Sequence, residues 1–216
     1  MVEALKLPNQ DDALAKARRR QIFLAACRVL ARKSFHQATV KEIAVEAGIA
    51  AGSIYLYLRS KDAILLLLAE SMVGELADSL PEIRAQAEDD PRRELLGIMR
   101  GAFDVIDRYR EAFAVLNHEV RYLGRRQQYR APLNQILEPY LGALSDVLER
   151  GRNRGLMRFA DVNSMVEAVH MLCSGWAMGT GLLVHTEKET YWQEIAAVIK
   201  GRFMTIELPS DPAKPA

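Results

Sequence analysis

Apolar residues recur at intervals of three and four through most of the chain, and no segment alternates apolar and polar residues over the length of a strand. The first pattern predicts helices that each bury one face, whereas alternation would predict strands. Runs rich in β-branched residues are also absent. We therefore predict an all-α chain of about nine helices.

The pattern at residues 39–58 predicts two short helices joined by a tight turn. Thr39 stands where a side-chain oxygen can cap the first helix. Gly48 follows the last apolar residue of that helix, where a left-handed turn suits glycine. Ile54 and Leu58, four apart, give the second helix an inward face and turn small, polar and aromatic side chains outward. Such a face suits the DNA major groove, although an ordinary αα-hairpin also fits this pattern.

The pattern extends to separated positions on both sides of this stretch: Phe35, Thr39, Val40, Ile43, Ala44, Ala47, Gly48, Ile49, Gly52, Tyr55, Tyr57, Leu58, Lys61, Asp62 and Leu65. Together they resemble the DNA-binding signature of the TetR family of bacterial transcription regulators, over about residues 18–66. In two departures, Ala50 replaces the usual Ser or Thr cap of the recognition helix, and Leu58 replaces the usual Phe.

The resemblance implies a DNA-binding domain at residues 13–60 and a helical ligand-binding and dimerisation domain at residues 61–208. It also implies a homodimer that reads a palindromic operator in double-stranded DNA and represses transcription. Tyr55, Tyr57 and Lys61 are expected at phosphates and Leu56 at base methyl groups. The predicted DNA-binding residues are Thr39, Val40, Ala50, Ala51, Gly52, Ser53, Tyr55, Leu56, Tyr57 and Lys61.

Charge supports this division of the chain. Residues 1–62 carry 11 Lys and Arg against 6 Asp and Glu, whereas the remaining residues carry 18 against 22. The basic end therefore contains the predicted helix-turn-helix, as nucleic-acid binding requires. Related regulators bring the start of the first helix, here residues 18–20, close to the DNA backbone. A solvated charged surface is the simpler alternative.

Caps and breaks place the other helices. We expect the first helix at residues 13–33, and Pro81 should end or kink the linking helix. Asp90 and Asp161 are candidate caps. The next helices are expected at residues 63–80, 91–109 and 113–122. A long helix should follow the basic stretch at residues 124–130, contain a kink at Pro139 and end near residue 153. The last two helices are expected from Asp161 to about residue 185 and at residues 188–208.

The stretch at residues 113–130 resembles the acyl-CoA-responsive FadR type of TetR regulator. An acyl chain needs an apolar tunnel, and the CoA phosphates need cations at its mouth. A solvated arginine run over an ordinary core, or a drug-induced repressor of an efflux pump, also fits these residues. The predicted ligand-binding residues are Phe103, Ile106, Phe113, Leu116, Arg121, Arg125, Leu137 and Met171.

Other functions find less support. The histidines have no metal-ligand spacing, and no nucleophile elbow or phosphate loop is present, so no catalytic residue, metal or cofactor is expected. A helical enzyme or an interaction module that does not read DNA stays the alternative class. Cys27 and Cys173 suit free thiols in the core, and no signal peptide or bilayer-spanning run is seen, so a cytoplasmic protein is expected. Gly175 and Gly179 suit a dimer contact, a ligand site or packing within the subunit.

Overall fold

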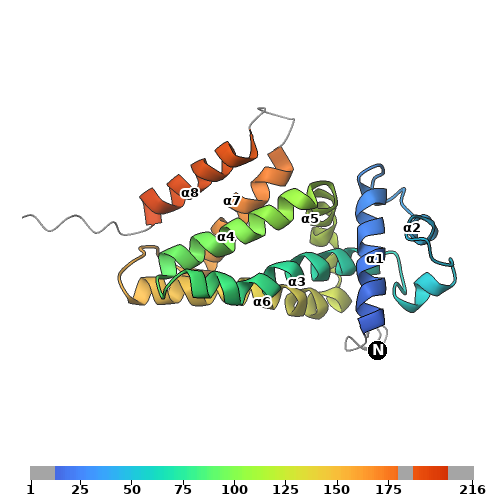
Figure 1. Ribbon diagram of the computed structural model, residues 1–216, viewed down its shortest axis with the longest axis horizontal. Helices are drawn as coiled ribbons and strands as arrows, with labels where there is room; N and C mark the ends of the chain where they lie inside the picture. Colours follow the sequence, from blue (N-terminus) through green and yellow to red (C-terminus); the bar gives the residue numbers. More distant parts are fainter. Residues whose placement is uncertain (1–12, 180–186, 204–216) are drawn as a thin grey trace, which may run out of the picture. The chain divides into compact units, whose positions relative to one another are not determined.

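The computed structural model describes residues 13–179 and 187–203, and all the regular elements in these two ranges are helices. The all-α prediction is confirmed (Figure 1). The elements are α1 (Ala13–Leu30), α2 (Val40–Glu46), the 3₁₀ helix η2 (Ser53–Leu56), α3 (Ala63–Gln86), α4 (Pro91–Arg108), α5 (Arg110–Arg125), α6 (Gln127–Asn153), α7 (Val162–Gly179) and α8 (Lys188–Phe203).

The chain divides into two compact units. The first combines Met1–Asp78 with Val105–Tyr140, and the second combines Ser79–Asp104 with Leu141–Ala216. Helices α3, α4 and α6 therefore contribute residues to both units. The predicted division at residues 60 and 61 is a functional one and stays a prediction.

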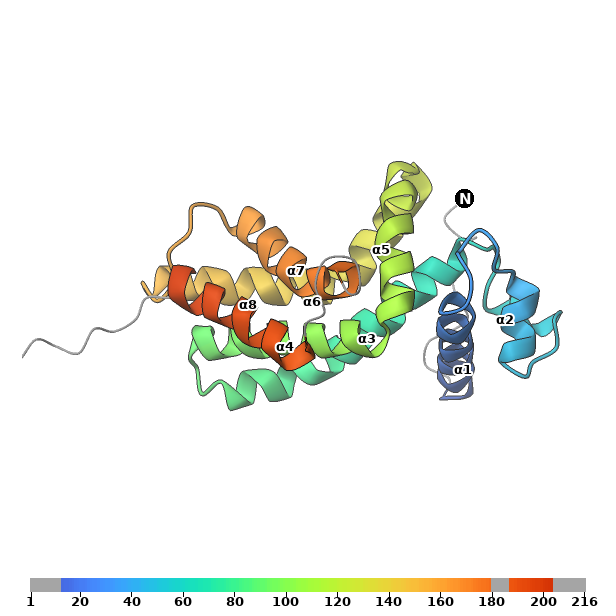
Figure 2. The ribbon, with the colours of Figure 1, turned by 90° about the horizontal axis from the view of Figure 1, so that it is seen from above.

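The first unit is built around α1, which packs against α2 and α5 (Figure 2). Phe23 of α1 is fully buried and meets the ring of Tyr109 edge-on, with the ring centroids 4.8 Å apart. All seven residues from 63 to 69 at the start of α3 are buried as well. A helix segment that is apolar on all sides must be surrounded, so this part of α3 is a core element of the first unit.

Helix α3 continues through Pro81 to Gln86, so an end of the helix near residue 80, one of the two effects predicted for Pro81, is wrong. The other predicted effect, a kink, stays a prediction. Pro81 is exposed, and water can satisfy the carbonyl that lacks the proline N–H as its partner. Helix α6 is likewise continuous through Pro132 and Pro139.

Other predicted boundaries agree better with the structure. The break near Arg110 is confirmed between α4 and α5. Asp90 Oδ1 accepts from Arg92 N at 2.8 Å, and Asp161 Oδ2 accepts from Ser164 N at 2.7 Å, so both caps are confirmed. The first helix ends at Leu30 rather than at residue 33. The expected helical residues at 180–185 and 204–208 lie outside the described ranges.

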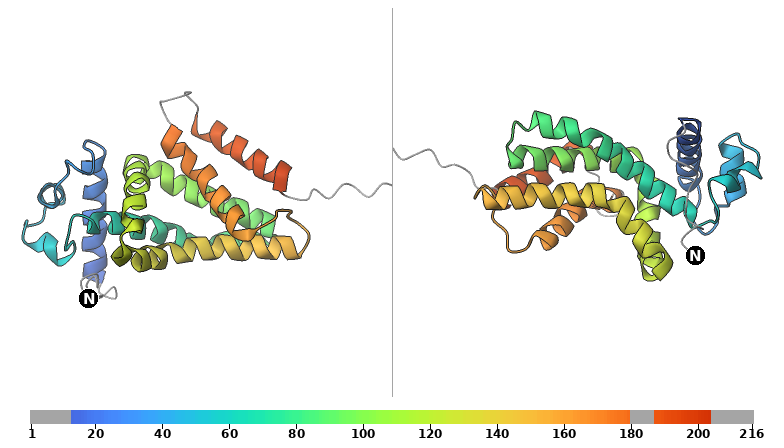
Figure 3. Two further views of the ribbon diagram at one scale, coloured as in Figure 1. Left: turned by 180° about the vertical axis from the view of Figure 1, so that it is seen from behind. Right: turned by 90° about the horizontal axis from the view of Figure 1, so that it is seen from below.

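In the second unit, α7 and α8 lie against each other (orange and red in Figure 3). The Tyr191 hydroxyl donates to Leu172 O at 3.2 Å and fills the space beside Gly175. A Cβ added at Gly175 would lie 2.6 Å from that hydroxyl oxygen. Gly175 therefore serves packing between two helices of one subunit, which was one of the three alternatives drawn from the sequence.

Both cysteines are free thiols, Cys27 half-buried in the first unit and Cys173 buried in the second. Burial raises the pKa of the Cys27 thiol to about 12 and that of the Cys173 thiol to about 12. None of the described helices has the length and apolar character needed to cross a membrane.

Candidate nucleic-acid interface

Helix α2 begins with the cap expected at Thr39. Thr39 Oγ1 accepts from Glu42 N at 3.1 Å, and the Glu42 carboxylate accepts from Thr39 N at 2.9 Å, which together form a capping box. A hydrogen bond from Lys33 lowers the pKa of the Glu42 carboxyl, and the bonds from Thr39 lower it further. The predicted cap is confirmed, and it fixes the first residues of the helix-turn-helix.

The turn after α2 depends on Gly48. Its φ is +64°, in the left-handed region that glycine adopts without steric cost. Ile49 N donates to Ala44 O at 3.0 Å, which closes the end of the helix, and the Ile49 side chain packs on the core. The predicted role of Gly48 in the turn is confirmed.

The second element of the motif is the 3₁₀ helix η2, not the second short α-helix predicted from the sequence. The cap residue of η2 is Gly52, which has no side chain, and no side-chain hydrogen bond caps the element. Ala50 lies two residues earlier, where its carbonyl oxygen accepts from Ser53 N at 2.9 Å and from Ile54 N at 3.3 Å. Its methyl group offers no oxygen to these N–H groups.

The outward face of η2 is the candidate reading surface. Ile54 and Leu58 are fully buried, whereas Tyr55 is 54% and Leu56 is 67% exposed. Tyr57 is partly buried and packs against the core. Of the other predicted DNA-binding residues, the exposed ones are Thr39, Ala50, Ala51, Gly52 and Ser53.

Val40 differs from the other predicted DNA-binding residues because it is buried, and its contact with DNA stays a prediction. Its side chain is 8% exposed and belongs to the core of the first unit, because its position shares the inward face of α2 with Ile43 and Ala44. The neighbouring Lys41, which the sequence prediction missed, is exposed in the first turn of α2. The exposure of Lys41 could have been predicted from the helical register, which turns position 41 outward.

Lys61 lies between η2 and α3. Its Nζ donates to His36 O at 2.7 Å and lies 5.0 Å from the ring centroid of Phe35. The amine is thus held against the loop before α2. A single carbonyl satisfies one of its three N–H donors, so the group keeps capacity for a phosphate.

The arginines at the start of α1 differ from the expectation for residues 18–20. Arg19 is buried and pairs with Glu70 of α3. Arg20 pairs with Glu75 of α3, and its Nη2 donates to the Tyr109 hydroxyl at 2.8 Å. Two of the three guanidinium groups therefore join α1 to other helices of the first unit. Arg18 and Arg20 are both exposed, and Arg18 Nη1 donates to Gln21 Oε1 at 2.8 Å.

The motif geometry agrees with what comparisons with known proteins find. The family model described as bacterial regulatory proteins, tetR family, matches residues 22–68. The fatty acid metabolism regulator protein of Bacillus subtilis is 31% identical over 136 residues, which are 62% of this chain and 68% of that protein. The chain belongs to the TetR family. As a TetR protein, it is a transcription regulator and not an enzyme.

Other TetR relatives agree over longer stretches. The HTH-type transcriptional repressor KstR2 of Rhodococcus jostii is 30% identical over 155 residues, 70% of this chain and 74% of that protein. The crystal structure of FadR from Bacillus subtilis in complex with stearoyl-CoA has a TM-score of 0.65 at 24% identity, and the match covers 83% of this chain and 96% of that one. At this identity the structural likeness shows the shared fold.

The predicted effector residues do not all lie in one unit of this TetR protein. Phe103 and Met171 belong to the second unit, the former fully buried and the latter 45% exposed. The others belong to the first unit, where Ile106 and Leu116 are buried. Phe113 and Leu137 are partly buried, Arg125 is exposed, and the side chain of Arg121 lies outside the described structure.

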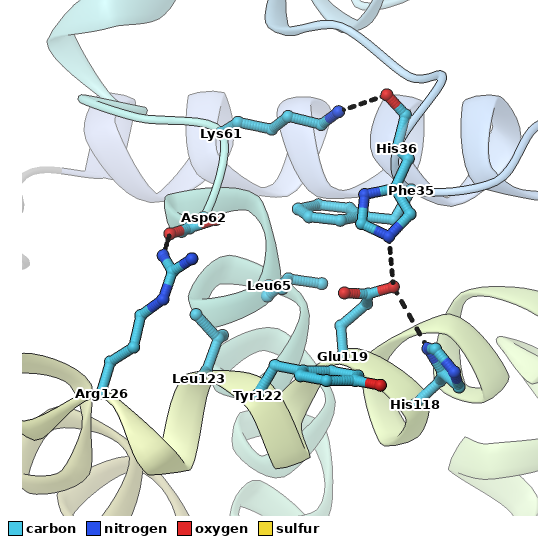
Figure 4. A pocket seen from close by; sticks show the side chains of 10 residues that line it. All are labelled: Phe35, His36, Lys61, Asp62, Leu65, His118, Glu119, Tyr122, Leu123 and Arg126. Atoms are coloured by element: carbon cyan, nitrogen blue, oxygen red, sulfur yellow. Dashed lines mark hydrogen bonds and ion pairs between the residues drawn. The ribbon is translucent and has the colours of Figure 1, made fainter.

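A pocket of about 500 Å³ does lie within the first unit (Figure 4). None of the predicted effector residues lines it. One face of α5 forms one wall of the pocket with Glu119, Tyr122, Leu123 and Arg126. These residues are three and four positions apart, so their shared face could have been predicted from the sequence. The pocket is lined by Phe35, His36, Lys61, Asp62, Leu65, His118, Glu119, Tyr122, Leu123 and Arg126.

Two histidines contact the same carboxylate in this pocket. His118 Nδ1 lies 3.2 Å and His36 Nε2 lies 3.7 Å from Glu119 Oε1. Across the described residues, no group of three His, Cys, Asp or Glu side chains is arranged to hold a metal ion.

Proposed function

We propose that the protein is a dimeric repressor that binds a palindromic operator and leaves it when a small hydrophobic effector binds. The observation that carries this proposal is the exposed pair Tyr55 and Leu56, presented on a turn that the buried Ile54 and Leu58 hold in place. An exposed leucine beside an exposed tyrosine does not add to the stability of the folded protein. Both suit a groove that offers phosphates and thymine methyl groups.

The capped start of α2 supports the same surface. Lys41 is exposed in its first turn, and the Lys61 amine is held at the loop before it. Both cations lie on the basic part of the sequence. Contacts of this type give affinity without sequence preference, whereas η2 would supply the preference.

A gel-shift titration with DNA from the region upstream of the protein's own gene tests this proposal. We expect a sequence-specific complex that weakens steeply as salt concentration rises. A scrambled DNA of the same length is the control for nonspecific binding. Equal affinity for both DNAs, or no complex at low salt, would contradict the proposal and favour an interaction module.

For the effector, we propose a long-chain acyl-CoA. The relative from Bacillus subtilis is named as a fatty acid metabolism regulator, and that name supports a fatty-acid-derived ligand here. Arg125 and Arg130 are exposed and lie where α5 ends and α6 begins, so they are available to phosphates. Arg126, also exposed, is paired with Asp62. A hydrophobic drug that induces an efflux pump is the second candidate.

Release of the operator complex by stearoyl-CoA tests the effector, with free CoA and stearate as controls. We expect release by the thioester at concentrations where neither control acts. Arg125→Ala should raise the concentration needed for release about tenfold while leaving DNA affinity intact. Arg158→Ala, which removes an exposed arginine of the second unit, should change neither. Release by stearate alone would contradict the proposal that the arginines bind the CoA phosphates. Release only by a hydrophobic dye would favour the second candidate, a hydrophobic drug that induces an efflux pump.

A further inference from the structure

We propose that the pocket of the first unit binds a small organic cation with N–H donors, a primary ammonium or a guanidinium, through the Glu119 carboxylate. This site is separate from the proposed acyl-CoA site and does not depend on DNA binding. It rests on the position of Glu119, the charges around it and the shape of the pocket.

Three segments of the first unit form the pocket (Figure 4). Phe35 and His36 come from the loop before α2, and Lys61, Asp62 and Leu65 come from the start of α3. One face of α5 forms the third wall. Glu119 points from α5 toward the loop, so its carboxylate lies in the pocket between the two histidine rings.

The other charged groups in the pocket already have partners. Asp62 Oδ2 accepts from Arg126 at 2.8 Å and from the Tyr129 hydroxyl at 3.0 Å. Lys61 is bound to His36 O and lies over Phe35. Asp62 and Arg126 thus compensate each other's charge, and the Lys61 amine is held at the carbonyl of His36.

Glu119 differs because, among the side chains that the structure describes, those paired with its carboxylate are histidines. The residue is 9% exposed, and among the described side chains no lysine or arginine lies within 4.0 Å of its carboxylate. A buried carboxylate without a cation carries a desolvation cost, and a neutral imidazole offers it a hydrogen bond but no charge. A ligand that brings a positive charge and N–H donors would supply what the site lacks.

The walls of the pocket suit a short carbon chain attached to that charge. Leu65 and Leu123 are buried and form an apolar floor, and Phe35 is also buried. Tyr122 is 57% exposed, and its ring lies along the rim beside Glu119. An aromatic face next to a carboxylate favours a cation over a neutral ligand. A volume of about 500 Å³ admits a small molecule, since ligand sites generally occupy this range.

Calorimetric titration of the full-length protein with agmatine, which carries both an ammonium and a guanidinium, tests the site. We expect agmatine to bind and pentanol, a neutral chain of similar length, not to bind. Glu119→Gln should weaken agmatine binding at least tenfold, because it replaces a charged acceptor by a neutral one of the same shape. Glu111→Gln is the matched control: it removes an exposed carboxylate of the same helix and should leave binding unchanged.

Histidine ring signals in an NMR spectrum give a second measurement. Agmatine should shift the signals of His36 and His118, assigned with His36→Gln and His118→Gln, and leave that of His170 in place. If wild-type protein does not bind agmatine at about 10 mM, the dissociation constant is too high for a specific site and the proposal is overturned. Equal binding by Glu119→Gln and wild type, at equal thermal stability, would also overturn it, and so would shifts confined to His170.

Discussion

The Lys61 amine is held by the carbonyl of His36 at the edge of the candidate reading surface. Replacing Lys61 with Gln removes one cation and keeps most of the side chain. We expect affinity for specific and nonspecific DNA to fall by the same factor, and the slope of log affinity against log salt to decrease by about 1. Lys200→Gln, at an exposed position of α8, is the control. An unchanged slope in Lys61→Gln would rule out a phosphate contact.

Leu56 offers a different test at the residue scale, because it is apolar and 67% exposed. Leu56→Ala should leave the free energy of unfolding nearly unchanged and reduce discrimination between operator and scrambled DNA by about 1 kcal/mol. Val45→Ala, which truncates another exposed apolar side chain, should not affect discrimination. Competition gel shifts with both DNAs measure this, and an equal loss in the two variants would place the base contact elsewhere.

At the scale of the element, no side chain caps η2. Ser53 N and Ile54 N both donate to the Ala50 carbonyl, so Ala50→Ser should give this turn a side-chain acceptor and raise the free energy of unfolding by about 0.5–1 kcal/mol. Ala51→Ser, at the next residue, should bring no such gain. Thermal unfolding of the two variants and the wild type measures the difference, and equal midpoints would show that water already caps this turn.

Local features of the elements could be predicted because their causes are local. Thr39, Gly48 and Asp161 act on backbone groups within three residues of themselves, and the structure confirms all three. The course of α3 past Pro81 could not be predicted in this way. Whether a proline ends a helix depends on what satisfies the freed carbonyl, and that depends on the environment of the folded chain.

At the scale of the whole molecule, the predicted homodimer needs an apolar surface, and exposed apolar side chains of the second unit supply a candidate. Met171 and Met178 of α7 and Val198 of α8 are each about half exposed, at 45%, 58% and 51%. Val198→Glu should weaken dimerisation at least tenfold, since it would bury a charge at the interface. Sedimentation at several concentrations measures it, and Leu14→Glu, at an exposed position of α1, is the control.

A Val198→Glu variant that stays dimeric at the lowest concentration would place the interface on another surface. If the variant is monomeric, it should also lose operator affinity, because two half-sites are then read separately. DNA binding and assembly would thereby be measured in one variant.

The candidate ligand sites could be predicted less well than the DNA-binding surface. The helix-turn-helix is continuous in sequence, so its exposed face follows from the helical period. The pocket around Glu119 combines a loop, the start of α3 and α5, and no period relates His36 to Glu119 across 83 positions of sequence. Apolar residues such as Ile106 and Leu116 look the same in sequence whether they line a tunnel or fill a core, and here they are buried.

The reactivity of each cysteine should report how often the unit around it opens. One thiol lies in each compact unit, and with a pKa of about 12 only about one group in 10⁵ is a thiolate at neutral pH. Each thiol should therefore react with a disulfide reagent mainly when its own unit opens. Labelling rates of the Cys27→Ala and Cys173→Ala variants would time the opening of one unit independently of the other. An effector that stabilises one unit would lower the labelling rate of the cysteine in that unit and leave the rate of the other cysteine unchanged.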